Sequence, residues 1–187
     1  MYIPYPKNEE KCLRRGQKLT DGMMDYLADR FFSQYGSADD YWIPTFITRL
    51  MEIDWSAYAG YKRVFAVMHQ NDHWFLMMLD NRTGVFHLYD NLPSEEESCV
   101  DIQELPIGEQ DLIEDYYGKI PSWPRLTNCG IFTLLNFLHL LLDCPMRYDP
   151  SPKHINQTIR PYLSRLVADS DLIPDVEILC ADHSRIV

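Results

Sequence analysis

A thiol, an imidazole and a carboxylate stand in three separate short motifs of this 187-residue chain. His73 follows a charged turn and starts an apolar run, Asp90 ends the next apolar run, and Cys129 starts a long apolar segment. Each lies where a strand ends or a helix begins, and such positions present side chains to a cleft. The three groups are the parts of an activated sulfur nucleophile. Their placement predicts a cysteine enzyme.

Cys129 has a setting that the other cysteines lack. A proline-containing loop precedes it, and Gly130 and an apolar helix follow it, so the positive end of the helix dipole favours the thiolate. Gly130 would let a substrate backbone approach the sulfur. The alternative is a core residue, which a cysteine before an apolar helix more often is. The other cysteines are Cys12, Cys99, Cys144 and Cys180.

His73 and Asp90 also have structural alternatives. A histidine at a strand end can simply make one backbone hydrogen bond, and aspartate often terminates a strand. Their joint placement favours chemistry, because the ends of adjacent strands would let the carboxylate hold the imidazole tautomer. His69, which ends the preceding strand, and His87, which lies inside a strand, are interpreted as structural or surface groups.

The elements that must position these residues follow from the apolar periodicity. The segment 129–143 has almost no polar side, so we expect a buried central helix there. A turn over 80–84 would place Gly84 at a positive φ. We expect one domain over 1–187 that begins with an irregular segment over 1–18. We expect strands over 63–69, 74–79 and 85–89, and loops over 93–97 and 120–128. We expect helices over about 20–36, from 45 onward, over 108–117, and over 154–167 with a kink or break at Pro161.

Composition excludes several functions. A net charge of −11 argues against nucleic-acid binding, which needs a basic surface, and no apolar stretch is long enough to cross a bilayer. Five irregularly spaced cysteines do not form a disulfide framework and favour a reducing compartment. The six histidines are scattered, so we expect no metal and no cofactor. We expect a monomer inside the cell, nuclear or cytoplasmic, or in a host cell if the chain is a pathogen effector.

Five blocks of the sequence resemble the ubiquitin-like-protein-specific cysteine proteases, the SUMO-protease class related to adenovirus protease. The His73-Trp74 pair, the Tyr89-Asp90 pair and the Cys129-Gly130 pair occur in that family's order, and the resemblance spans about residues 19–166. The blocks are Leu19-Thr20-Asp21-Gly22-Met23-Met24, the segment 64–79 with His69 and His73-Trp74, Leu88-Tyr89-Asp90-Asn91-Leu92, Asn128-Cys129-Gly130-Ile131-Phe132, and the segment from Thr158-Ile159-Arg160 to Leu166.

The resemblance implies an α+β, papain-like fold of the SUMO-protease type, with a mixed central sheet flanked by helices and the nucleophile at the start of a buried central helix. It implies that Cys129 is the nucleophile, His73 the general base and Asp90 the group that orients it. Trp74 would wall a narrow channel for a Gly-Gly tail. The implied partners are a ubiquitin-like protein, such as SUMO or ubiquitin, and its conjugates.

Three positions depart from the family pattern. Trp123 stands where the family has the glutamine that donates to the oxyanion, although its indole N–H could substitute. Lys18 stands where a tryptophan often precedes the first block, and Asn128 replaces an aspartate. Three alternatives to the protease therefore stay open: an inactive protein of the same fold that binds ubiquitin-like modifiers, an acetyltransferase with the same nucleophile, and a protease for polyproteins.

Overall fold

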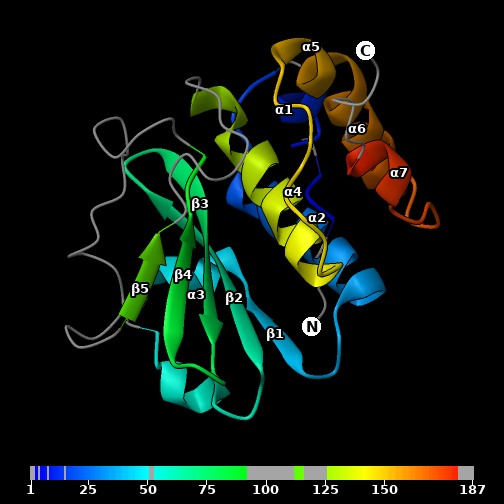
Figure 1. Cartoon of the computed structure of the whole chain (residues 1–187). Coiled ribbons are helices and arrows are strands. Elements are labelled where there is room, and N and C mark those ends of the chain that lie inside the picture. Colours follow the sequence, from blue (N-terminus) through cyan, green and yellow to red (C-terminus); the bar gives the residue numbers. More distant parts are fainter. Residues whose placement is uncertain are drawn as a thin grey trace.

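A five-stranded mixed sheet supports one layer of helices on each of its faces (Figure 1). The computed structural model describes residues 3, 5–7, 9–14, 16–50, 53–91, 112–115 and 126–180. The strands, in their order across the sheet, are β1 (Asp40–Ile43), β2 (Arg63–Gln70), β3 (His73–Asp80), β4 (Val85–Tyr89) and β5 (Leu112–Asp115). The three central strands are antiparallel, and both edge strands run parallel to their neighbours.

The three central strands confirm the sequence predictions, whereas the edges do not. β1 was not predicted, because four residues are too few to show a clear alternation. The helix predicted over 108–117 is wrong, since β5 lies there. Its backbone pairs with β4 from Val85↔Leu112 to Leu88↔Asp115. An open sheet edge offers hydrogen-bond partners to the backbone, and that tertiary context overrides a weak local preference.

Two tight turns set the register of the central strands. Asn71 and Asp72 have φ values of 49° and 64°, the left-handed conformation that both central residues of a type I′ hairpin need. Gln70 therefore pairs with His73, which is the first residue of β3. Gly84 has φ 70°, as predicted. Antiparallel pairing then brings the end of β4 alongside the beginning of β3.

The helices confirm most of the predicted boundaries. Thr20 caps the second helix by accepting a hydrogen bond from the Met23 N–H, and Gly36 follows its last residue. The segment 1–18 was predicted to be irregular, but it contains a one-turn helix. The helices are α1 (Lys11–Arg14), α2 (Asp21–Tyr35), α3 (Thr45–Leu50), η1 (Trp55–Tyr58), η4 (Leu126–Asn128), α4 (Cys129–Leu141), α5 (Pro152–His154), η5 (Ile155–Ile159), α6 (Arg160–Ala168) and α7 (Val176–Leu179).

The predicted kink in the last long helix is a π-helical turn. η5 separates α5 from α6 and has the wider i→i+5 geometry. It ends just before Arg160, and Pro161 occupies the first turn of α6, where proline's missing N–H costs no intrahelical hydrogen bond. The four-residue α7, which follows a turn, was not predicted.

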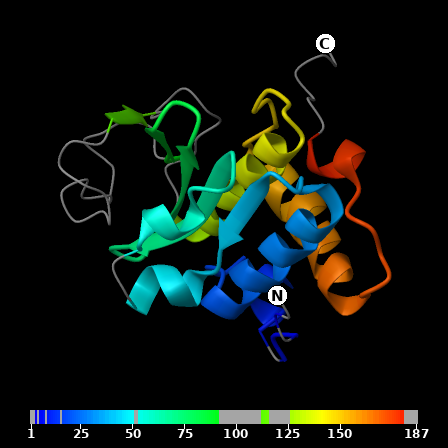
Figure 2. The same cartoon turned by 90° about the horizontal axis from the view of Figure 1, so that it is seen from below.

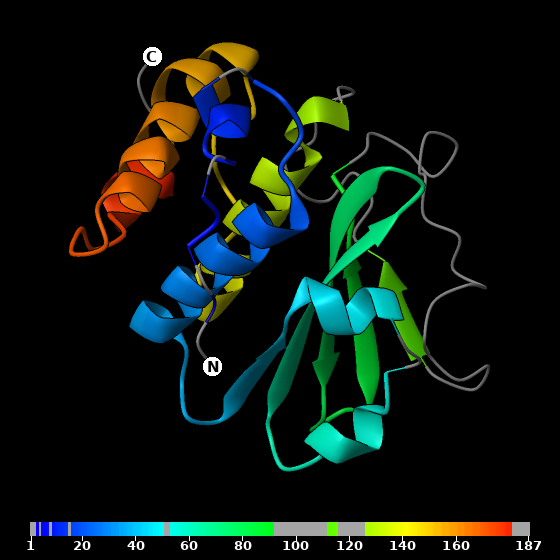
Figure 3. The ribbon, with the colours of Figure 1, turned by 180° about the vertical axis from the view of Figure 1, so that it is seen from behind.

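The sheet buries both of its faces. Side chains of β3 alternate, so that Trp74, Leu76 and Met78 face one core and Phe75, Met77 and Leu79 the other. The first core lies under α2 and α4, with α6 outside them (Figure 2). α3 and η1 lie on the opposite face (Figure 3). Twelve of the thirteen residues of α4 are buried, which confirms a central helix.

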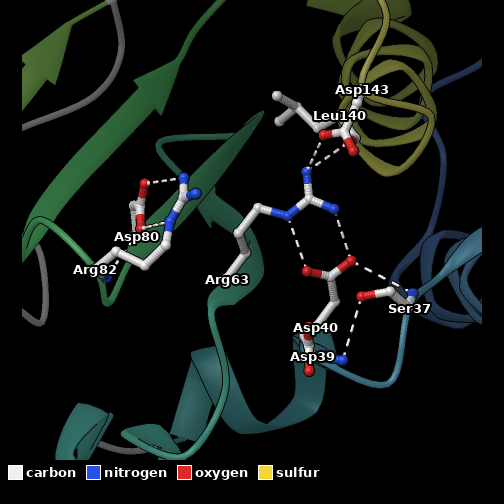
Figure 4. A network of polar contacts seen from close by, with 8 residues as sticks. All are labelled: Ser37, Asp39, Asp40, Arg63, Asp80, Arg82, Leu140 and Asp143. Atoms are coloured by element: carbon white, nitrogen blue, oxygen red, sulfur yellow. Dashed lines mark hydrogen bonds and ion pairs between the residues drawn. The ribbon is translucent and has the colours of Figure 1, made fainter.

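Arg63 joins the sheet to the C-terminal end of α4 (Figure 4). Its guanidinium donates two hydrogen bonds to Asp40, at 2.8 and 2.7 Å, and one at 2.8 Å to the Leu140 carbonyl, and it forms an ion pair with Asp143. Burial alone would raise the pKa of Asp40, but Arg63 outweighs it and holds that pKa below its ordinary value. The contacts of Arg63 therefore hold β1 against β2 and both strands against the end of α4.

Candidate active site

The imidazole of His73 and the carboxylate of Asp90 meet inside the protein. The Nε2 atom of His73 lies 2.8 Å from Oδ1 of Asp90, and both side chains are fully buried. His73 starts β3 and Asp90 directly follows β4, so the antiparallel pairing of these strands produces the contact. A carboxylate oxygen can only accept at that distance, so Nε2 carries the proton.

The sulfur of Cys129 lies beside this pair. Cys129 is the first residue of α4, and its Sγ accepts a hydrogen bond of 3.4 Å from the backbone N–H of Trp74. Since Trp74 follows His73 in β3, the strand that carries the imidazole also holds the sulfur. The backbone N–H groups of the first turn of α4 lie near the sulfur, at the positive end of the helix dipole. Cys129 is only 3% exposed.

The environment of His73 favours its charged form. Burial alone lowers the pKa of His73, but the hydrogen bond to Asp90, the charge of that carboxylate and the neighbouring Cys129 outweigh burial and raise that pKa from 6.5 to about 9. The other ring nitrogen, Nδ1, is buried and has no partner of ordinary hydrogen-bond geometry among the described residues. A buried imidazolium between an acid and a thiol is suited to proton transfer.

Gly130 has a packing role that the sequence did not indicate. A Cβ atom at this position would lie 3.0 Å from Sδ of Met24, and 3.2 Å from both Cβ of Leu19 and Cδ1 of Trp74. The missing side chain therefore lets the start of α4 approach α2 and β3 closely. We predicted that this glycine lets a substrate backbone approach the sulfur, and that role stays a prediction.

Arg160 fixes the segment that leads into Cys129. Its guanidinium donates to Oδ1 of Asn128 at 2.9 and 3.3 Å, to the Thr127 carbonyl at 2.8 Å and to the Cys12 carbonyl at 3.0 Å. The side chain is 2% exposed, and burial lowers its pKa. From the sequence we gave Arg160 no role. The signal that could have identified it is a charged residue among the regularly spaced apolar residues of a predicted helix.

A second buried network lies behind Asp90. Asn91 donates to the Tyr148 hydroxyl at 3.0 Å, Tyr148 donates to Asn136 at 2.8 Å, and Asn136 donates back to Asn91 at 2.7 Å. The three hydrogen bonds form a closed ring next in sequence to the carboxylate. The signal for it was Asn136, an amide in the middle of the apolar run 129–143.

Other predicted site residues have different outcomes. Trp74 is buried, its indole N–H donates to the Leu19 carbonyl at 3.0 Å, and its ring centroid lies 4.4 Å from that of His69. Lys18, which replaces the family's tryptophan, forms an ion pair with Asp72 in the turn before His73. Trp123 lies outside the described residues, so the predicted oxyanion donor stays a prediction.

No family model and no curated protein sequence matches this chain. Among the described residues, no helix is both long and apolar enough to cross a membrane. Solved structures do match. The SUMO protease Ulp1, with its catalytic cysteine oxidized to a sulfenic acid, aligns with a TM-score of 0.62 and 18% identity, covering 86% of this chain and 81% of that chain.

Two further structures give the same result. The C-terminal Ulp1 protease domain in complex with Smt3, the yeast ortholog of SUMO, has a TM-score of 0.60 and 17% identity, over 85% of this chain and 80% of that chain. The Ulp1-like SUMO protease catalytic domain of Chaetomium thermophilum has a TM-score of 0.55 and 12% identity, over 80% and 72%. These likenesses confirm the predicted fold class.

Proposed function

We propose that this chain is a cysteine protease that cleaves after the Gly-Gly tail of a ubiquitin-like modifier. The observation that carries the proposal is the buried contact of 2.8 Å between His73 and Asp90, with the sulfur of Cys129 held at the same strand. The likeness of the fold to SUMO proteases supports a ubiquitin-like protein as the substrate.

In this mechanism the Cys129 thiolate attacks the carbonyl carbon of the last glycine. The oxyanion forms beside the backbone N–H groups at the start of α4, which donate to it. His73 gives its proton to the leaving amine, and the C–N bond breaks to leave a thioester. Water, deprotonated by His73, then hydrolyses the thioester and restores the thiol. Asp90 keeps the imidazole oriented throughout.

The burial of Cys129 and Trp74 supports selectivity for a substrate tail with small side chains. Cys129 is 3% and Trp74 2% exposed, so a substrate must reach the sulfur as a slender extended segment. Glycine lacks a side chain that would clash beside Trp74. Lys18, which stands where the family often has a tryptophan, forms an ion pair with Asp72 in the turn before His73, so a charged pair replaces an aromatic ring at that position.

The test is labelling by ubiquitin-like proteins that carry a C-terminal electrophile. A panel that includes SUMO and ubiquitin should give one covalent adduct, mapped to Cys129 by mass spectrometry. Cys129→Ala should abolish the adduct and keep the fold by circular dichroism. Cys12→Ala is the matched control, because Cys12 is also buried, and it should label normally. An adduct on any other cysteine would refute the assignment.

A protein that binds ubiquitin-like modifiers without turnover is the second candidate. It is favoured by Trp123, which replaces an oxyanion donor whose removal costs about 100-fold or more in other proteases. Hydrolysis of a fluorogenic ubiquitin-like substrate by the parent chain excludes it. Tight binding without hydrolysis, with hydrolysis gained in Trp123→Gln, establishes it instead. A requirement for acetyl-CoA would favour an acetyltransferase over both.

A further inference from the structure

Three soft metal ligands meet at the C-terminal end of α4. A ring nitrogen of His139 and the sulfurs of Cys144 and Cys180 all lie within 4.8 Å of one another. His139 is ten positions after Cys129 in the same helix, which corresponds to about 15 Å along the axis. The cluster is therefore separate from the candidate active site, at the other end of the helix.

Local backbone structure brings these ligands together. Asp143 has φ 50°, and this left-handed residue turns the chain back so that the Cys144 N–H donates to the His139 carbonyl at 3.0 Å. Cys180 follows α7, where its N–H donates to the Val176 carbonyl at 2.8 Å. Leu179, next to it, is fully buried and anchors α7 in the core.

The spacing suits a tetrahedral zinc ion. With Zn–S of about 2.3 Å and Zn–N of about 2.0 Å, tetrahedral geometry separates two sulfurs by about 3.8 Å and a sulfur from a nitrogen by about 3.5 Å. Sγ of Cys180 lies 3.8 Å from Nδ1 of His139. No two ligand atoms lie more than 4.8 Å apart, so enclosing the ion shortens a sulfur–sulfur distance by about 1 Å at most and a sulfur–nitrogen distance by about 1.3 Å at most.

The ring nitrogen that faces Cys180, Nδ1 of His139, also lies 2.7 Å from the Leu135 carbonyl oxygen. That oxygen can only accept, so Nδ1 carries the proton when no metal is bound. Zinc binding through Nδ1 would replace this hydrogen bond and leave the proton on Nε2. His139 is 1% exposed, and both cysteines are partly buried.

We propose that His139, Cys144 and Cys180 bind one zinc ion that ties α7 to the end of α4. Zinc binding releases one proton from each thiol and none from the neutral imidazole. The fourth position is left to water or another donor. Two thiolates and an imidazole are the ligands of zinc, whereas magnesium and calcium require oxygen ligands.

The test uses the full chain carrying Cys129→Ala, so that the nucleophile cannot bind the metal. The reduced, chelator-treated protein is titrated with Co²⁺, which reports thiolate ligation by a near-ultraviolet charge-transfer band and tetrahedral geometry by visible bands. We expect one Co²⁺ per chain and its displacement by Zn²⁺. Cys144→Ser and Cys180→Ser should each weaken binding about tenfold or more, and Cys12→Ala should not.

A second measurement needs no substitution at the ligands. Zinc should protect Cys144 and Cys180, but not Cys12, from alkylation, as mapped by mass spectrometry. The proposal is overturned if the cobalt bands persist in the Cys144→Ser, Cys180→Ser double variant, if zinc gives no protection, or if these two cysteines form a disulfide that persists in reductant. None of these results depends on protease activity.

Discussion

Asp90 should control the protonation of His73, and Asp90→Asn tests this directly. The pKa of His73 is raised from 6.5 to about 9, with Asp90 as the largest contribution opposing burial. Since a tenfold change in proton affinity is about 1.4 kcal/mol, the site favours the imidazolium by roughly 3 kcal/mol. The asparagine keeps the size of the side chain and removes its charge, while burial continues to disfavour the imidazolium.

The pKa of His73 should therefore fall by about 2.5 pH units, to near 6.5. At about pH 8, roughly nine in ten rings are protonated with a pKa of 9, compared with roughly one in thirty with a pKa of 6.5. A step that needs the proton of His73 would then lose about 30-fold at that pH from protonation alone. Removing the carboxylate that orients the ring adds to this loss.

Stability should follow the same titration. Because the folded-state pKa of His73 is raised, its contribution to stability is fully present below about pH 6.5 and is lost as the pH rises through about 9. Urea unfolding of the parent chain should therefore show stability decreasing across that window. The Asp90→Asn variant should show a much smaller decrease across the same range.

The assay is nitrogen-15 NMR of the histidine rings across this pH range. His139 is the internal control, because burial lowers its pKa and the Asp90 substitution should leave that pKa unchanged. The reasoning fails if His73 of Asp90→Asn still titrates above about pH 8, since Asp90 would then not be the source of the raised pKa.

Three further substitutions test the packing and polar networks by urea unfolding. Gly130→Ala should cost about 1–3 kcal/mol because its Cβ would be overpacked against Met24; unchanged stability would contradict that close packing. Arg63→Met should cost about 3–5 kcal/mol because it leaves the buried Asp40 unpaired, whereas Arg82→Gln, at an exposed ion pair, should have a far smaller effect. Tyr148→Phe should cost about 1–3 kcal/mol because it opens the buried hydrogen-bonded ring; a neutral result would mean that water or another group replaces the hydroxyl.

The sequence alone predicted the strands and helices whose apolar residues recur at a regular spacing. The strands β2, β3 and β4 and the helices α2 and α4 were predicted because the apolar spacing typical of a strand or helix lies within their own residues. Their caps and turns are also formed by residues that are close in sequence. The three motifs around His73, Asp90 and Cys129 were visible for the same reason, since each lies at the boundary of such an element.

Tertiary structure alone decided features that join residues distant in sequence. The edge strand β5 forms because β4 offers it a backbone to pair with. Gly130 gains its role only when Leu19, Met24 and Trp74 pack around it.

The cluster of His139 with two cysteines was equally hidden. Cys144 and Cys180 lie 36 positions apart, and no spacing rule for zinc ligands covers that separation. The chain brings them together through α6 and α7, whose packing depends on the whole core. A local sequence pattern reflects the conformation and burial of residues that are neighbours in the chain, whereas contacts between distant residues depend on how all the elements pack together.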